Sequence, residues 1–281
     1  MKFFKLLIPL FLFLNNSSFS QIEEYYLGEN IKESVKYQRI KEIKGEIFKF
    51  ADNKIEKEGK QVFLFGFDSR GNMIREQIYN RKKEKTNLNM EYIYNNEDVI
   101  TESNEYDASG KIKIKCKYVY DAKGKLIERL KNKPNGKLSS HIRYKFDENG
   151  RKISEEWYNH KGTLYEEKKF DFDDEGNFIE ETHYNDDGST GAHFTYNYDE
   201  GKRLSEKVSL YSDGSVYERW EYKYNENGNR AEDHHFFSDE KPECILKYVY
   251  DDRLNVSEIK VLTSMGKISK LVKYTYIFYT Y

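Results

Sequence analysis

The stretch YKFDENGRKISEEWYNHKGTLYEE, residues 144–167, holds two turn motifs, FDENG and YNHKG, about half a repeat apart. Its aromatic pair, Tyr144 and Phe146, belongs to a series that recurs every 26 residues. The series comprises Tyr92/Tyr94, Tyr118/Tyr120, Tyr144/Phe146, Phe170/Phe172, Tyr196/Tyr198, Tyr222/Tyr224, Tyr248/Tyr250 and Tyr274/Tyr276, with Phe65/Phe67 as an earlier copy. Because alternate residues of a strand share one face, each pair places two rings on the same side. This period of two predicts strands rather than helices.

Two columns of glycine keep the same step and mark the turns. The first column contains Gly110, Gly136, Gly162, Gly188, Gly214 and Gly266, and the second contains Gly124, Gly150, Gly176 and Gly228. Glu240 interrupts the first column, and Lys202 and Leu254 interrupt the second. In YDAKG, FDENG and FDDEG an aspartate opens the turn and a glycine closes it, as in a type I turn with a left-handed bulge residue. Each repeat therefore predicts two antiparallel strands.

The fold class predicted by this pattern is all-β, an antiparallel β-hairpin repeat meander of period 26. We count roughly sixteen to eighteen strands from Gln61 onward. A twisted open sheet rarely exceeds about 10 strands without curling, so we expect a curved or spiralling elongated sheet. The predicted divisions are a signal peptide at 1–20, degenerate capping strands at 21–61 and the repeat array at 62–281.

The first twenty residues have the pattern of a secretory signal peptide. Lys2 and Lys5 precede the apolar run LLIPLFLFL and the small polar residues NNSSFS, which favours cleavage after Ser20. We therefore expect an exported protein, which is periplasmic, on the cell surface or secreted. Loss of the two lysines lowers the net charge from −2 to −4. Such a balance offers no basic face for nucleic acid.

The segments YVYDAKGKLIE (118–128) and YKFDENGRKIS (144–154) resemble the tyrosine–aspartate repeats of the RHS/YD family. The resemblance covers about residues 62–276. It implies strips of β-hairpins that curl into a spiral in exported bacterial proteins, with roles in toxin delivery, cell-surface contact or carbohydrate binding. The chain is too short to enclose a cargo, and we recognise no toxin domain in it. We therefore expect neither encapsulation nor toxicity here. The half-units YNHKG and YNDDG resemble MORN-type repeats more distantly, which implies an interaction scaffold or an antitoxin-like protein.

The sequence offers few groups for chemistry. DFDDEGNFIEET (171–182) has part of the spacing of a calcium loop, but Thr182 stands where a bidentate glutamate is needed. His234 and His235 are adjacent on a predicted strand and so point to opposite faces. No nucleophile elbow, phosphate loop or cysteine–histidine pair appears in the sequence. We predict no catalytic residue, no metal and no cofactor.

Cys116 and Cys244 are the two cysteines, and they lie nearly five repeats apart. A meander separates them by about 48 Å along the sheet, at about 4.8 Å per strand. A disulfide needs Cα atoms within about 7 Å of each other, so we predict two free thiols.

A column of acids also follows the repeat, at Glu102, Glu128, Glu180, Glu206, Glu232 and Glu258, with Ser154 in the gap. Folding the hairpin about its turn sets Glu128 opposite Tyr118, on one face. This predicts a ladder of tyrosine hydroxyls bonded to carboxylates. Its structural interpretation is cross-strand pairing that stabilises a thin sheet. Its functional interpretation is an aromatic groove for sugars.

These observations predict an exported, non-catalytic binding or scaffolding module at the cell envelope, whose partner is an envelope or surface protein or a glycan. The alternative is a surface carbohydrate-binding protein that uses exposed Tyr and Trp rings. A third hypothesis is an enzyme such as a glycan hydrolase. The candidate ligand-binding residues are Trp157, Trp220, Tyr118, Tyr144, Tyr196 and Tyr222. We expect no membrane span after signal cleavage. A membrane barrel needs a continuous apolar outer face, whereas one face here carries Lys, Asp and Asn and the other mixes Tyr with Glu.

Overall fold

The computed structural model describes residues 32–51, 54–80, 85–237 and 240–280. The predicted signal peptide, 1–20, and the following residues to 31 lie outside these ranges. In the described ranges a helix at 32–38 precedes the strands. These are β1 (Ile40–Ala51), β2 (Lys54–Ile55), β3 (Lys60–Phe67), β4 (Met73–Asn80), β5 (Lys85–Tyr94), β6 (Ile100–Tyr106), β7 (Ile112–Tyr120), β8 (Leu126–Asn132), β9 (Leu138–Phe146), β10 (Lys152–Asn159), β11 (Leu164–Phe172), β12 (Phe178–Asn185), β13 (Thr190–Tyr198), β14 (Leu204–Leu210), β15 (Val216–Tyr224), β16 (Arg230–Phe236), β17 (Cys244–Tyr250), β18 (Val256–Thr263) and β19 (Ile268–Phe278).

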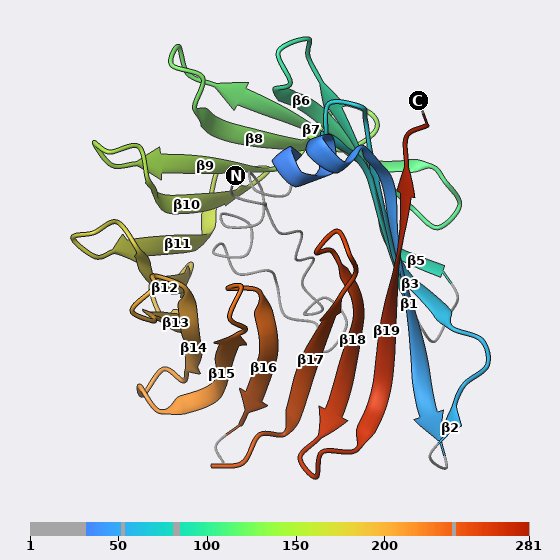
Figure 1. Ribbon diagram of the computed structural model, residues 1–281. Helices are drawn as coiled ribbons and strands as arrows, with labels where there is room; N and C mark the ends of the chain where they lie inside the picture. The colour runs from blue at the N-terminus through green and yellow to red at the C-terminus, as the bar shows by residue number, and fades with distance from the viewer. Residues whose placement is uncertain (1–31, 52–53, 81–84, 238–239, 281) are drawn as a thin grey trace.

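The strands form a closed antiparallel barrel (Figure 1). From β3 to β19 each strand pairs with the next one along the chain, and β1 pairs with both β3 and β19. The predicted antiparallel hairpin meander is confirmed. The predicted open, curved or spiralling elongated sheet is wrong, because β1 joins the two edges of the array. The physical reason is that pairing both edges removes two rows of unsatisfied backbone groups, which an open sheet would leave exposed.

Glycine is required where β1 closes the barrel. Gly45 lies opposite Tyr274 on β19 and opposite Phe63 on β3. A Cβ atom at this position would stand 2.0 Å from Cε1 of Phe63. The missing side chain therefore lets the Phe63 ring cover the closing strand.

The turns follow the predicted type I pattern with little variation. The Asp121 carboxylate accepts hydrogen bonds from the backbone N–H groups of Lys123 and Lys125, at 2.8 and 2.9 Å. Gly124 then adopts φ = +78°. Lys202 and Leu254, which interrupt this glycine column, keep the same left-handed conformation at φ = 57° and 63°. The turn geometry therefore persists even where its preferred residue is absent.

In most hairpins one bulge shifts the strand register by one residue, whereas β16 and β17 pair without a shift. Tyr120 pairs with Leu126, but Val119 pairs with Glu128 and Tyr118 with Arg129. The predicted ladder that sets Glu128 opposite Tyr118 is therefore wrong, because that prediction omitted the bulge residue, Ile127. The acid column instead faces outward, where its members meet basic side chains of the next strand. These pairs include Glu128–Arg143 at 3.3 Å, Glu232–Lys247 at 2.6 Å and Glu258–Lys273 at 3.8 Å.

The aromatic pairs lie on the inner face of the barrel. On β7, Cys116 is buried, whereas the alternate residues Lys113, Lys115 and Lys117 are exposed on the outside. Val35 of the helix packs into the same core cluster as inward residues of the strands. The helix lies at one end of the barrel (Figure 1), where the Gln38 amide donates to Asn255 in a turn, at 2.9 Å.

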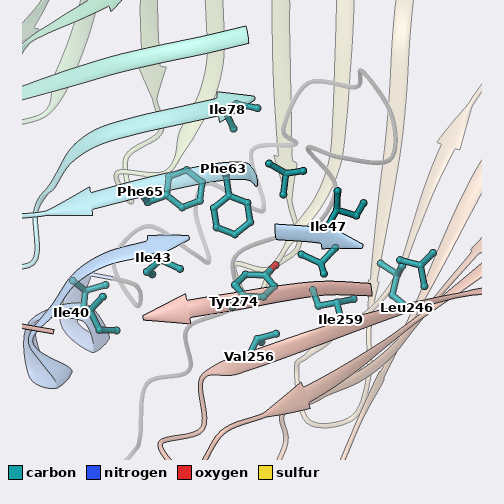
Figure 2. Close-up of a cluster of buried hydrophobic side chains, with 14 of the residues drawn as sticks. Ile40, Ile43, Ile47, Phe63, Phe65, Ile78, Leu246, Val256, Ile259 and Tyr274 are labelled. Carbon is teal, nitrogen blue, oxygen red and sulfur yellow. The ribbon is translucent and has the colours of Figure 1, made fainter. Parts of the chain in front are cut away.

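The inner face divides into two walls. The inward residues of β1, β3, β4 and β15–β19 form what we call the apolar wall, and Figure 2 shows many of its side chains. Its fully or nearly fully buried members are Ile40, Ile43, Ile47, Val62, Phe63, Phe65, Phe67, Ile78, Trp220, Tyr222, Leu246, Val256, Ile259, Val261, Val272 and Tyr274. The inward residues of β6–β14 form the polar wall. There the buried apolar cluster is reduced to Phe170, Phe178 and Tyr196.

Candidate functional site

The six residues predicted to bind a ligand all lie on the inner face. Their register partners establish this, as Trp157 pairs with Ile142 and Trp220 with Lys207. Trp220, Tyr222 and Tyr196 are buried, and Trp157, Tyr118 and Tyr144 are half-buried. The closed sheet therefore does not present these rings on its outer surface.

Tyrosine hydroxyls on the inner face bond neighbouring strands in a repeated pattern. The second tyrosine of a pair donates to the carbonyl oxygen of the residue 20 positions earlier. These bonds are Tyr120–Ile100 at 2.7 Å, Tyr198–Phe178 at 2.8 Å, Tyr224–Leu204 at 2.8 Å, Tyr250–Arg230 at 2.7 Å and Tyr276–Val256 at 2.8 Å. The first tyrosine meets a polar side chain 15 positions earlier, as in Tyr196–Glu181 at 3.0 Å. These contacts give Tyr196 and Tyr118, which meets Ser103 at 3.2 Å, a structural role.

A buried ion pair between Arg230 and Asp233 lies against the Tyr222 ring. The Arg230 guanidinium lies 3.6 Å from the Tyr222 ring centroid and 2.5 Å from the Asp233 carboxylate. Burial alone lowers the pKa of Arg230, but Asp233 and neighbouring tyrosines raise that pKa well above its ordinary value. Tyr248 donates its hydroxyl to Asp233. Because its partners satisfy each charge within the core, this cluster serves structure rather than ligand binding.

The fold brings together a cysteine and a histidine that the sequence did not pair. Cys244 is the register partner of His235, which stacks on Trp220 with centroids 4.1 Å apart. The His235 ring also contacts Phe237, and its Nε2 lies 2.9 Å from Glu218. This order of thiol, imidazole and carboxylate resembles a nucleophile with its base. However, burial and then Glu243 raise the pKa of the Cys244 thiol to about 11, so the nucleophilic thiolate is scarce at neutral pH.

The two cysteines are free thiols, as predicted. His234 and His235 lie on opposite faces, since His235 pairs with inward Cys244 and His234 with outward Ile245. Within the described ranges no group of three His, Cys, Asp or Glu side chains is arranged to hold a metal ion.

Trp157 forms a different arrangement on the polar wall. Nζ of Lys131 lies 4.7 Å from the Trp157 ring centroid, and Nζ of Lys168 lies 5.6 Å from it. Glu166 is the register partner of Trp157 on β11. Trp157 Nε1 is buried and has no hydrogen-bond acceptor in the described part of the chain. Two ammonium groups thus lie over the Trp157 ring, in the place where a stacked sugar would have to lie. The indole N–H of Trp157 has no acceptor among the described residues.

Lys131 lies beside acids that are paired elsewhere. Glu105 bonds Lys113 at 2.7 Å, and Glu155 bonds Lys152 at 2.6 Å. Among the described residues, no carboxylate oxygen stands within 4.0 Å of Lys131 Nζ. Burial, followed by the charge of Arg129, lowers the pKa of this lysine. The polar wall therefore contains an ammonium group with no close counter-charge.

Three exposed rings lie together at the barrel end opposite the helix. Tyr211, Tyr217 and Phe237 are 52%, 45% and 41% exposed, and we call them the ring patch. The centroids of Tyr211 and Tyr217 are 5.1 Å apart, and those of Tyr217 and Phe237 are 6.3 Å apart. The periodic columns did not predict this patch, because its three residues lie outside them. Its signal in the sequence is Tyr211, an aromatic residue that opens a turn where the other repeats have the polar residues Asp107, Lys133, Asn159, Asn185 and Thr263.

In the described part of the chain, no helix combines the length and the apolar character needed to cross a membrane.

Comparisons with known proteins identify no family. No family model and no curated protein matches the chain. Among solved structures, a porin-like protein from Bacteroides uniformis is similar over 85% of this chain and 98% of its own, with 10% identity and a TM-score of 0.46. A porin-like protein from Bacteroides vulgatus is similar over 83% and 97%, with 14% identity and a TM-score of 0.31. The complex TcdB2-TccC3-Cdc42 matches 79% of this chain, which spans 17% of that one, at 9% identity and a TM-score of 0.33. Each TM-score is below 0.5, so these likenesses establish neither family nor function.

Proposed function

We propose that this protein is an exported, non-catalytic binding module of the cell envelope, built from RHS/YD-like repeats. The observation that carries the proposal is the ring patch. Exposed aromatic residues that touch one another are uncommon on a free surface and are enriched where proteins bind partners. Tyr and Phe rings bury a large area at little conformational cost, which suits them to anchor a partner.

The charged residues of the outer face support the proposal that water, rather than lipid, surrounds the barrel. This face carries cross-strand ion pairs such as Glu128–Arg143, and exposed lysines such as Lys113, Lys115 and Lys117. Lipid hydrocarbon would not solvate such groups at mid-strand. We therefore place the binding surface at the barrel end, at the ring patch, rather than in a membrane.

An affinity capture tests this function. The tagged chain from residue 21 is incubated with native envelope and culture-supernatant fractions, in parallel with a Tyr211→Ser, Tyr217→Ser, Phe237→Ser triple variant. A matched control replaces the exposed Tyr37, which lies on the helix at 69% exposure. We expect a stoichiometric partner that the wild type and the control retain and the triple variant loses. Equal retention by all three proteins would reject the ring patch as the binding surface.

Carbohydrate binding is the second candidate, and the ring patch also favours it. Exposed rings stack on sugar faces, and these three are more exposed than Trp157 or Trp220. A glycan titration with the same triple variant separates the two candidates. Retained polysaccharide with no retained protein would favour the carbohydrate function.

A further inference from the structure

The strongest unexplained group on the inner face is Lys131. Its ammonium group lies over the Trp157 ring, and Lys168 places a second ammonium group within 6 Å of the same centroid. In the described ranges the carboxylate within 4.0 Å of either Nζ is Glu166, at 3.7 Å from Lys168. Two cations therefore share one ring, and the other acids near them, Glu105, Glu155 and Glu181, are bonded to other side chains. An added anion would relieve their mutual repulsion.

One hydrogen-bond donor of this site has no acceptor among the described residues. The Trp157 N–H is buried without an acceptor, which costs free energy in any folded protein. Ser140, the register partner of Lys131, adds a hydroxyl group at the same level. Glu166, directly across from Trp157, is the acceptor within reach of a ligand hydroxyl. A ligand that fits must offer a negative charge together with hydroxyl groups.

The side chains of this site are partly exposed on the inner face. Lys131, Trp157 and Ser140 are half-buried rather than buried. Barrels of 16–18 strands are too wide for their own side chains to fill, in contrast to barrels of about 8 strands. The apolar wall does not extend here, since the core cluster of the polar wall consists of Phe170, Phe178 and Tyr196.

We propose that Lys131, Trp157 and Lys168 form a binding site for an acidic sugar, a uronic acid whose carboxylate is held by Lys131 and the Trp157 N–H. Glu166 and Ser140 contact the sugar hydroxyls. The inference rests on the proposal that this protein is a binding module, and it adds a second site with its own ligand class. It uses side chains on the polar wall and none from the ring patch, so the two sites fail independently.

Tryptophan fluorescence tests the site directly, because the chain has two tryptophans. In a Trp220→Phe variant, Trp157 is the remaining tryptophan and reports on its own surroundings. We titrate this protein with a short oligogalacturonate and with its methyl ester, which keeps the rings but removes the charge. We expect a saturable change with the acid and at least tenfold weaker binding of the ester.

Two lysine variants separate a site from general charge attraction. Lys131→Met in the Trp220→Phe background is expected to weaken oligogalacturonate binding at least tenfold. Lys115→Met removes an exposed lysine on the outer face of β7 and is expected to leave binding unchanged. Circular dichroism and melting curves establish that each variant is folded, and Lys131→Gln replaces Lys131→Met if the latter does not fold.

The outcomes decide between the proposals. Equal affinity for acid and ester, or equal affinity of the Lys131 and Lys115 variants, overturns the acidic-sugar site. No binding of the acid at millimolar concentration also overturns it. In either case a partner lost by the ring-patch variant would leave the proposed binding function intact. Binding of acetate as tight as that of the oligosaccharide would reduce the site to a carboxylate site and overturn its assignment to sugars.

Discussion

The apolar wall and the polar wall are built from the same repeat but have different inward side chains. At the position that holds Trp220 and Leu246 in the apolar wall, the polar wall has Cys116, Ile142, Lys168 and Phe194, so the charged residue Lys168 is the difference there. At the position of Ile259 and Asp233 in the apolar wall, the polar wall has Ser103, Arg129, Glu155, Glu181 and Lys207. Both walls nevertheless share their turns, their bulges and their tyrosine hydrogen bonds. The repeated residues therefore determine the backbone. The other inward residues differ between the walls, and they form a buried core in one wall and a polar surface in the other.

Truncation of Phe63 is expected to give the largest effect. Phe63 is fully buried, and its ring centroid lies 5.0 Å from that of Phe65 and 5.3 Å from that of Tyr274. Phe63→Ala should lower the free energy of unfolding by about 3–5 kcal/mol. The matched variant in the polar wall is Phe146→Ala, where a half-buried ring should cost about 1–2 kcal/mol. Equal losses in urea titrations would contradict the division into two walls.

Breaking the buried ion pair is expected to come next. Arg230→Met leaves the Asp233 carboxylate, 1% exposed, without its cation. The loss should be about 3 kcal/mol, because an unpaired buried charge is costly. Arg219→Met on neighbouring β15 removes an exposed partner of Glu221 and should cost less than about 1 kcal/mol. A loss at Arg230 as small as that at Arg219 would show that water reaches this part of the apolar wall.

The tyrosine hydrogen bonds should contribute equally in both walls. Tyr224→Phe removes the bond to the Leu204 carbonyl, and Tyr120→Phe removes the equivalent bond to Ile100. Each should lower the free energy of unfolding by about 1 kcal/mol. Tyr217→Phe, in an exposed ring of the patch, serves as the control and should change it little. A large difference between Tyr224 and Tyr120 would show that this part of the repeat is not shared.

The smallest expected effect is a gain in stability at the interrupted turns. Leu254 and Lys202 adopt the left-handed conformation, which costs a residue with a Cβ about 1–2 kcal/mol. Leu254→Gly and Lys202→Gly should each raise the free energy of unfolding by about 0.5 kcal/mol, since glycine gives back part of the gain as chain entropy. Thermal melting measures both. A lower melting temperature for both variants would mean that their side chains contribute more than the backbone strain costs.

Periodicity was enough to predict the strands, the turns and the antiparallel order, because aromatic pairs and glycines recur without drift. It was also enough to predict two unpaired cysteines. It did not predict closure, since nothing in the irregular segment around Gly45 indicates that β1 pairs with the distant strand β19 as well as with β3. It also misplaced the Glu128 column by one residue, because a bulge leaves no mark in the repeat length. The pairings Cys244–His235 and Lys131–Trp157 depend on that register and were beyond reach for the same reason.

The seam at β1 has a consequence for the order of folding. Ile40 pairs with Phe278, so the first of the described strands closes against the last of them. Neighbouring hairpins can form as soon as each has been synthesised, but the seam has to wait for nearly the whole chain. Contacts between residues so distant in sequence are slow to form, and both edges stay open to other chains until they do. The interval between the completion of β19 and its pairing with β1 is therefore when this protein is most exposed to aggregation.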